Sequence, residues 1–177
     1  GKVHEKVLLK AWQAQGRRAG TIGAAHRWAW AGSSATLADV TTPPAPIQFY
    51  FDFISPFGYF ASLRIEALAA RHGRTVEWHA MLLGVSVMKV MGLKPLMDTP
   101  LKGPYIAREM RRYVRKHGLA IGRKPDDPVM DPRACGRAFH WVKRHHPELA
   151  APLAHAIYHA YWGEGQDLST AEAISLL

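Results

Sequence analysis

Near residue 50 a strand pattern leads directly into the start of a helix, which limits the chain to a few fold classes. Residues 47–53, IQFYFDF, are aromatic and β-prone, which predicts a buried strand. Ser55-Pro56 follows, and a serine before a proline is typical of a helix N-cap and its first helical residue. The pattern then predicts a helix that ends at Gly73.

A second strand is expected over residues 75–81, TVEWHAM. Residues 47–81 therefore form a βαβ unit, whose strands should be parallel and whose crossover should be right-handed. Two strands do not make a stable sheet on their own. For the helix between them we expect the buried face to hold Phe60, Leu63, Ala67 and Leu68, with Arg64, Glu66 and Arg71 towards solvent.

The rest of the chain after residue 81 has a helical character. Three amphipathic helices are predicted over residues 105–118, 131–147 and 148–165. A fourth begins near residue 170, with Ser169 or Thr170 as its N-cap.

Residues 1–46 differ from the remainder, because they are rich in Gly, Ala, Ser and Thr and end in the helix-breaking TTPPAP. We interpret them as a poorly ordered leader or linker. Arg17-Arg18 suggests twin-arginine export, but His26 and Arg27 interrupt the apolar stretch that such a signal needs.

The composition, 48% hydrophobic over 177 residues, suits one domain with a core. The net charge of +9 is compatible with nucleic acid, an anionic surface or an acidic small substrate. We expect no nucleic acid, because the basic residues are dispersed and no recognition module is present. Apolar runs are too short to cross a membrane. The single cysteine, Cys135, excludes an internal disulfide and a CxxC pair, which fits a cytoplasmic setting.

The ten histidines include pairs such as His155 and His159, at helical spacing. No carboxylate or cysteine joins them in a known motif, so we expect no metal.

The junction at Ser55 allows two interpretations. A helix N-terminus presents unpaired N–H groups and a positive dipole end, so Ser55 is either a cap or part of an anion site. In thioredoxin-like folds the reactive thiolate lies at this place. Here the four residues are Ser55, Pro56, Phe57 and Gly58, which carry no thiol. A serine hydroxyl cannot exchange disulfides, but it can donate a hydrogen bond to the thiolate of a bound thiol.

The pattern from Asp52 and Phe53 through Ser55-Pro56 to Tyr59 resembles the opening of the 2-hydroxychromene-2-carboxylate isomerases and kappa-class glutathione transferases. These belong to the DsbA-like thioredoxin-fold group. The resemblance continues through VEWHAMLLGVSVMKVMG and YIAREMRRYVRKHGL and covers about residues 47–175.

This resemblance implies an α/β, thioredoxin-like fold. Residues 47–81 would begin the thioredoxin unit and residues 82–177 would form a helical insertion. The family's closing strands, cis-proline loop and final helix have no counterpart before Leu177, so we expect the chain to be truncated at its C-terminus.

The resemblance also implies glutathione as the cofactor, bound through Ser55, Pro56 and Phe57, with Ser55 as the catalytic residue. Ser55 and the helix N-terminus would lower the pKa of the glutathione thiol. The thiolate would add to an unsaturated substrate, allow bond rotation and then leave, which is a cis–trans isomerisation in aromatic catabolism such as naphthalene degradation.

The substrate implied is a small acidic aromatic molecule. Lys89 would face its carboxylate or that of glutathione, although a solvated loop lysine is an equal alternative. Tyr105, Arg112 and Tyr113 could line an aromatic pocket, but such a stripe is more often core. Asp131 replaces the polar residue, commonly asparagine, of relatives, which leaves its role open.

Three questions stay open at this level. A kappa-like glutathione transferase or peroxidase would use the same Ser55 geometry. A catalytically silent thiol-binding module is a further alternative. A homodimer is compatible with the sequence.

Overall fold

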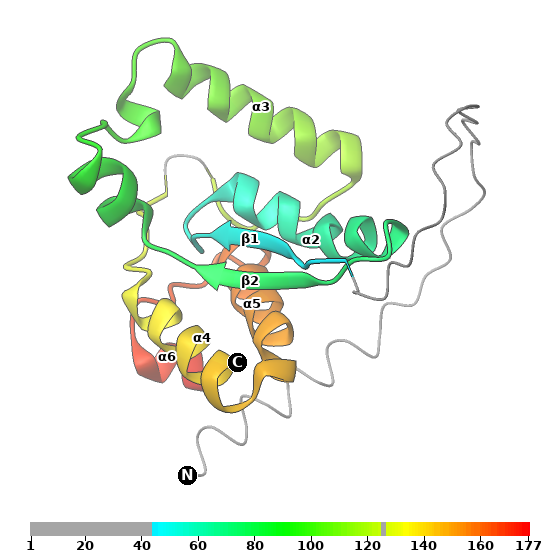
Figure 1. Cartoon of the computed structure of the whole chain (residues 1–177). Coiled ribbons are helices and arrows are strands. Elements are labelled where there is room, and N and C mark those ends of the chain that lie inside the picture. Colours follow the sequence, from blue (N-terminus) through cyan, green and yellow to red (C-terminus); the bar gives the residue numbers. More distant parts are fainter. Residues whose placement is uncertain (1–43, 125–126) are drawn as a thin grey trace, which may run out of the picture.

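The computed structural model describes residues 44–124 and 127–177 (Figure 1). It begins with strand β1 (Ile47–Phe51), helix α2 (Pro56–Arg71) and strand β2 (Val76–Ala80). The strands are parallel, with Phe49 opposite Trp78. The predicted βαβ unit is therefore confirmed, whereas the predicted leader and its twin-arginine alternative concern residues 1–46, of which 1–43 lie outside the described residues.

Helical elements follow β2. They are the π-helix η1 (Gly84–Val90), the 3-10 helix η2 (Leu96–Asp98), α3 (Lys102–His117), α4 (Arg133–His145), the 3-10 helix η3 (Pro147–Leu149), α5 (Ala150–Tyr158), the π-helix η4 (His159–Gly163) and α6 (Ala171–Ser175). Of the two candidate caps for the last helix, Thr170 is the N-cap and accepts a hydrogen bond from the Ala173 N–H at 3.2 Å.

The prediction of a helix over residues 148–165 is confirmed in its extent, because helical turns run without a break from Pro147 to Gly163, but the helix is not uniform. The segment divides into η3, α5 and η4, and the Glu164 N–H donates to the His159 carbonyl at 3.0 Å, a bond that spans five residues. Such a widened turn depends on tertiary contacts rather than on helix propensity, and π-turns occur frequently at functional sites. The π-helix η1 was also not predicted.

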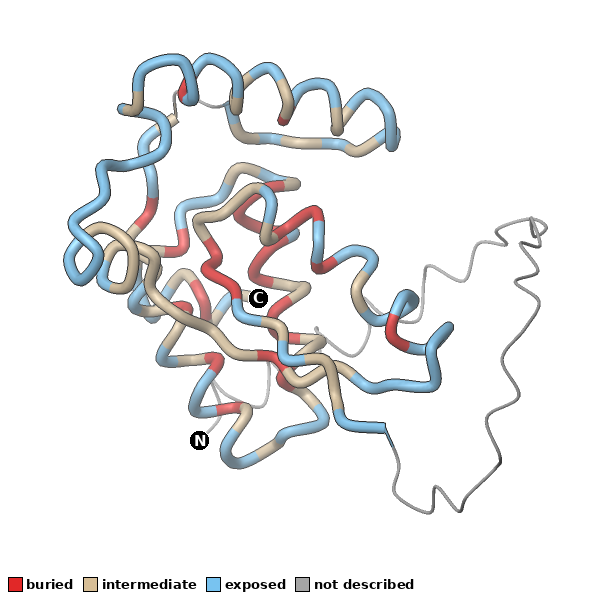
Figure 2. Tube along the Cα trace, turned by 45° about the horizontal axis from the view of Figure 1, so that its top comes forward, coloured by how far each residue is buried: buried red, intermediate tan, exposed pale blue. Residues whose placement is uncertain are grey.

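The core lies on one face of the small sheet. Phe49 and Phe51 of β1 and Trp78 of β2 point to this face, where the Phe51 ring lies 5.3 Å from that of Phe139 in α4 and 5.7 Å from that of Tyr158 in α5. Buried residues gather in the middle of the molecule, whereas α3 lies at its margin and is mostly exposed (Figure 2).

The buried face of α2 differs from the predicted one. Leu63, Ala67 and Leu68 are exposed, and Phe60 alone of the predicted four is buried. The reason is that α2 packs along α5, with the Tyr59 ring 5.7 Å from that of Tyr158, which turns another stripe inwards. The buried residues of α2 are Tyr59, Phe60, Ser62 and Ala69.

None of the helices in the described part of the chain combines the length and the apolar character that a membrane span requires.

Candidate functional site

Ser55 is the N-cap of α2. Its Oγ accepts a hydrogen bond from the Gly58 N–H at 3.1 Å, and its carbonyl accepts one from the Tyr59 N–H at 3.0 Å. Pro56, which has no N–H to satisfy, is the first helical residue. The capping interpretation of Ser55 is thus confirmed.

The cap leaves two hydrogen-bond donors at the helix N-terminus. Ser55 Oγ accepts from Gly58, and no acceptor for the Ser55 hydroxyl hydrogen or the Phe57 N–H lies among the described residues. Both donors lie at the positive end of a 16-residue helix. This turn can therefore receive an anion such as a thiolate, and it brings together the predicted thiol-binding residues Ser55, Pro56 and Phe57.

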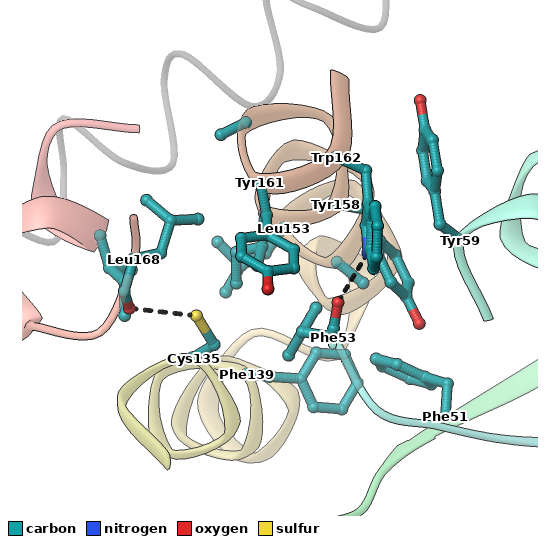
Figure 3. Packing of buried hydrophobic residues seen from close by; sticks show 14 of the residues in the cluster. Phe51, Phe53, Tyr59, Cys135, Phe139, Leu153, Tyr158, Tyr161, Trp162 and Leu168 are labelled. Atoms are coloured by element: carbon teal, nitrogen blue, oxygen red, sulfur yellow. Dashed lines mark hydrogen bonds between the residues drawn. The ribbon is translucent and has the colours of Figure 1, made fainter. Parts of the chain in front are cut away.

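The junction between β1 and α2 is held from the opposite side by two aromatic residues. The Tyr158 hydroxyl donates to the Asp52 carbonyl at 3.0 Å, and the Trp162 indole N–H donates to the Phe53 carbonyl at 2.9 Å. Figure 3 shows the bond from Trp162 to the Phe53 segment. Side chains of α5 and η4 therefore fix the backbone that presents Ser55.

Gly58 lies where the two sides of the junction meet. A Cβ atom at this position would come within 2.6 Å of the Tyr158 hydroxyl oxygen and 3.3 Å of the Ser55 Cβ. A contact of 2.6 Å is shorter than real side chains allow, so the close approach requires glycine.

Burial keeps Tyr158 neutral. Burial first, and the nearby Asp52 carboxylate second, raise the pKa of the Tyr158 hydroxyl far above its ordinary value. Tyr158 is therefore a hydrogen-bond donor to the junction and not a base.

The single cysteine takes no part in this site. Cys135 is fully buried, and its Sγ lies 3.5 Å from the Leu168 carbonyl oxygen (Figure 3). Burial raises the pKa of the Cys135 thiol to about 12, so the reactive thiolate form is scarce.

Tyr113 lies near the Ser55 turn through a chain of rings. Its ring stacks on that of Phe60 at 4.4 Å and lies tilted against that of His117 at 4.2 Å, and the Phe60 ring in turn contacts that of Phe57 edge-on at 5.9 Å. Tyr113 of α3 is thus linked to Phe57, one of the predicted thiol-binding residues, through the ring of Phe60.

Lys89 and Tyr105 lie further out. Lys89 is exposed in η1, and Tyr105, near the start of α3, is 55% exposed. Neither side chain has a hydrogen bond, ion pair or ring contact to the Ser55 turn among the described residues. Their assignment as substrate-binding residues stays a prediction.

Arg112 and Asp131 have local partners. The Arg112 guanidinium pairs with Glu109 one helical turn away. Asp131 pairs with Arg133, whose hydrogen bonds lower the pKa of the Asp131 carboxyl to about 2. Both groups are thus engaged locally rather than directed to the Ser55 turn.

The histidine pairs are also engaged. His155 pairs with Glu66 at 3.2 Å, and His159 pairs with Glu164 at 3.3 Å. Within residues 44–124 and 127–177, no group of three or more His, Cys, Asp or Glu side chains could hold a metal ion.

Sequence reasoning missed Asp52, Tyr158 and Trp162. Asp52 was noted only as part of a motif, and its contacts with Tyr158 join residues that are 106 positions apart. The sequence does carry one signal for these contacts. Tyr158, Tyr161 and Trp162 stand close together in an otherwise alanine-rich helix, and buried Tyr and Trp usually have a hydrogen-bond partner elsewhere in the fold.

The parallel βαβ unit, with a helix capped by Ser55 directly after its first strand, has the arrangement with which thioredoxin-like folds open. The chain belongs to the DSBA-like thioredoxin domain family, which it matches over residues 46–177. The predicted fold class is therefore confirmed.

Two curated relatives carry the same name. The chain is 27% identical over 136 residues to 2-hydroxychromene-2-carboxylate isomerase of Pseudomonas putida, a match that covers 72% of this chain and 62% of that protein. It is 28% identical over 76 residues to the isomerase of the same name from Pseudomonas sp. (strain C18), covering 42% of this chain and 36% of that protein.

A solved structure of 2-hydroxychromene-2-carboxylate isomerase is also similar. It matches with a TM-score of 0.53 at 25% sequence identity, over 70% of this chain and 59% of that one. The chain thus spans less than two thirds of the length of the relatives it matches.

Proposed function

We propose that the protein is a glutathione-dependent isomerase that acts on small acidic aromatic compounds of the 2-hydroxychromene-2-carboxylate type. The similarity to enzymes of that name supports the reaction class. The proposal assigns glutathione as the cofactor and Ser55, Pro56 and Phe57 as the residues that hold its sulfur. A single, buried cysteine suits work in a reducing compartment such as the cytoplasm.

The observation that carries the proposal is the hydrogen-bonding state of the Ser55 turn. Ser55 Oγ accepts from Gly58, while its own hydrogen and the Phe57 N–H remain available. A thiolate bound at the N-terminal end of this turn would accept both hydrogen bonds and lie at the positive end of the α2 dipole. Both effects favour the ionised thiol and lower its pKa.

The role of Ser55 is to stabilise the nucleophile. The glutathione thiolate forms a C–S bond to the conjugated carbon of the ring-opened substrate, and the electron pair moves to the carbonyl oxygen. The former double bond, now single, rotates. Reverse elimination breaks the C–S bond and restores both the double bond and the thiolate, so glutathione is not consumed. The proposed role of Lys89 is to bind the substrate carboxylate, and Tyr105 and Tyr113 would contact the aromatic ring.

The test compares wild-type protein with Ser55→Ala in the glutathione-dependent conversion of 2-hydroxychromene-2-carboxylate. Removal of one anion-stabilising donor should lower kcat by on the order of 10²-fold. Ser62→Ala is the matched control, because Ser62 is a serine of the same helix whose hydroxyl donates to the Tyr59 carbonyl. Equal turnover by wild type and Ser55→Ala would contradict the proposal, and accumulation of a stable glutathione conjugate would indicate a transferase instead.

A further inference from the structure

The carboxyl group of Asp52 joins the ends of both strands. Asp52 follows β1 directly and is only 2% exposed. Its Oδ1 accepts from the Ile54 N–H at 3.2 Å, and its Oδ2 accepts from the Leu83 N–H at 2.7 Å. Ile54 precedes Ser55, and Leu83 precedes the π-helix η1 that carries Lys89. One buried carboxyl group therefore contacts both segments to which ligand-binding roles are assigned.

The placement of this carboxyl group is energetically unfavourable in itself. Burial raises the pKa of Asp52, and the N–H groups of Leu83 and Ile54 only partly oppose that effect. No Lys, Arg or His side chain pairs with Asp52 among the described residues. Burial of an acid without a basic partner destabilises a fold. The hydrogen bonds that Asp52 accepts from the Leu83 and Ile54 N–H groups are therefore what this residue contributes to the structure.

The segment after β2 has few other means of holding its position. None of the residues of η1 is buried, and Lys89 and Val90 are exposed. The local hydrogen bonds from Val85 and Ser86 to the Leu82 carbonyl shape the turn but do not tie it to the rest of the molecule. The bond from the Leu83 N–H to the Asp52 carboxyl group does so, at the N-terminal end of η1.

We propose that Asp52 is a positioning residue that couples the Ser55 turn to the Lys89 segment, and so sets the separation between the thiol site and the group that binds the substrate carboxylate. The proposal rests on the proposed function for the roles of Ser55 and Lys89. The coupling itself is a property of the ligand-free chain and can be tested without any activity.

The first experiment measures amide hydrogen exchange in ligand-free protein. Asp52→Asn keeps the shape of the side chain, but its NH₂ group takes the place of one carboxyl oxygen. The Leu83 and Ile54 N–H groups each need an oxygen acceptor, so one of them loses its hydrogen bond. Exchange at the Leu83–Val90 amides should accelerate by about tenfold. Ser62→Ala, which removes another buried hydrogen bond, should leave these amides unchanged. Unchanged exchange of this segment in Asp52→Asn overturns the proposal, whatever the activity.

The second experiment is a double-mutant cycle of Asp52→Asn with Lys89→Met, read as KM for the substrate. Each single substitution should raise KM by roughly tenfold, and the double variant should be no worse than Lys89→Met alone, because Asp52 acts through Lys89. Additive effects overturn the proposal, as does an active enzyme whose KM is indifferent to Lys89→Met. An inactive wild type refutes the proposed function, and the exchange measurement then decides the coupling by itself.

Discussion

The ends of the two strands differ in how firmly they are held. The end of β1, residues 52–58, is fixed by Tyr158 and Trp162 on one side and by the Asp52 side chain from within. The end of β2, residues 81–90, continues the strand pairing through Met81 and is then joined to β1 through the Leu83 N–H. The candidate site therefore combines a rigid half, which would hold a thiol, with an exposed half whose position depends on the first.

The largest effect is expected from Gly58→Ala in the rigid half. The new Cβ would come within 2.6 Å of the Tyr158 hydroxyl oxygen, and such overpacking should lower the free energy of unfolding by about 3 kcal/mol, the upper end of the usual cost. Urea unfolding measures the loss. Gly136→Ala in α4 is the matched control, because its Cβ would meet nothing within 4 Å and should stabilise the helix by about 0.5–1 kcal/mol.

The cause of that loss can be checked with a double variant. Tyr158→Phe removes the oxygen that the added methyl group would strike, so it should recover part of the stability lost by Gly58→Ala. Strict additivity of the two changes would show that the close approach to Tyr158 is not the cause.

A smaller effect is expected from Trp162→Phe. It leaves the Phe53 carbonyl without a donor among the described residues and shrinks a buried ring, which should lower the free energy of unfolding by roughly 2 kcal/mol. Tyr158→Phe should have about half this effect, because the Asp52 carbonyl retains its hydrogen bond from the Ser55 N–H. The reverse ranking in thermal or urea unfolding would contradict this account of the junction.

The Asp52 carboxyl group predicts a pH dependence of stability. Its pKa is raised in the folded chain by burial, so the folded state binds the proton more tightly than the unfolded state. The stability of the wild type relative to Asp52→Asn should therefore decline as pH rises from about the ordinary value of 3.8 through the folded pKa, and then level off. A relative stability that increases with pH over this interval would show that the hydrogen bonds outweigh burial.

The smallest effect is expected in the exposed half. Lys89→Met and Val90→Ser alter exposed side chains of η1, so each should change the free energy of unfolding by less than about 0.5 kcal/mol. A loss as large as that of Trp162→Phe would show that the two strand ends are held equally firmly.

The sequence predicted what local patterns determine. The strands follow from β-prone runs, and the start of α2 follows from the capping Ser55 before Pro56. The end of α3 follows from Gly118, which adopts the left-handed region with φ of 59°. The two π-helices, η1 and η4, were missed because an added residue in a helical turn is selected by distant contacts.

The buried face of α2 was mispredicted for a similar reason. Leu63 and Leu68 are apolar at helical spacing, but the path of α5 decides which stripe of α2 is covered. For the site, the motif around Ser55 was visible. The contacts of Asp52 with Leu83 and Tyr158 were not, because they join residues 31 and 106 positions apart.

In the proposed function, the Ser55 turn stabilises the thiolate of bound glutathione. Titration of thiolate ultraviolet absorbance in the presence of glutathione tests it directly, in wild type and in Ser55→Ala. We expect bound glutathione in the wild type to ionise well below the roughly 8.5 of a free thiol, and in Ser55→Ala to shift back towards that value. The same thiol pKa in both proteins would contradict the claim and leave Ser55 as a helix cap alone.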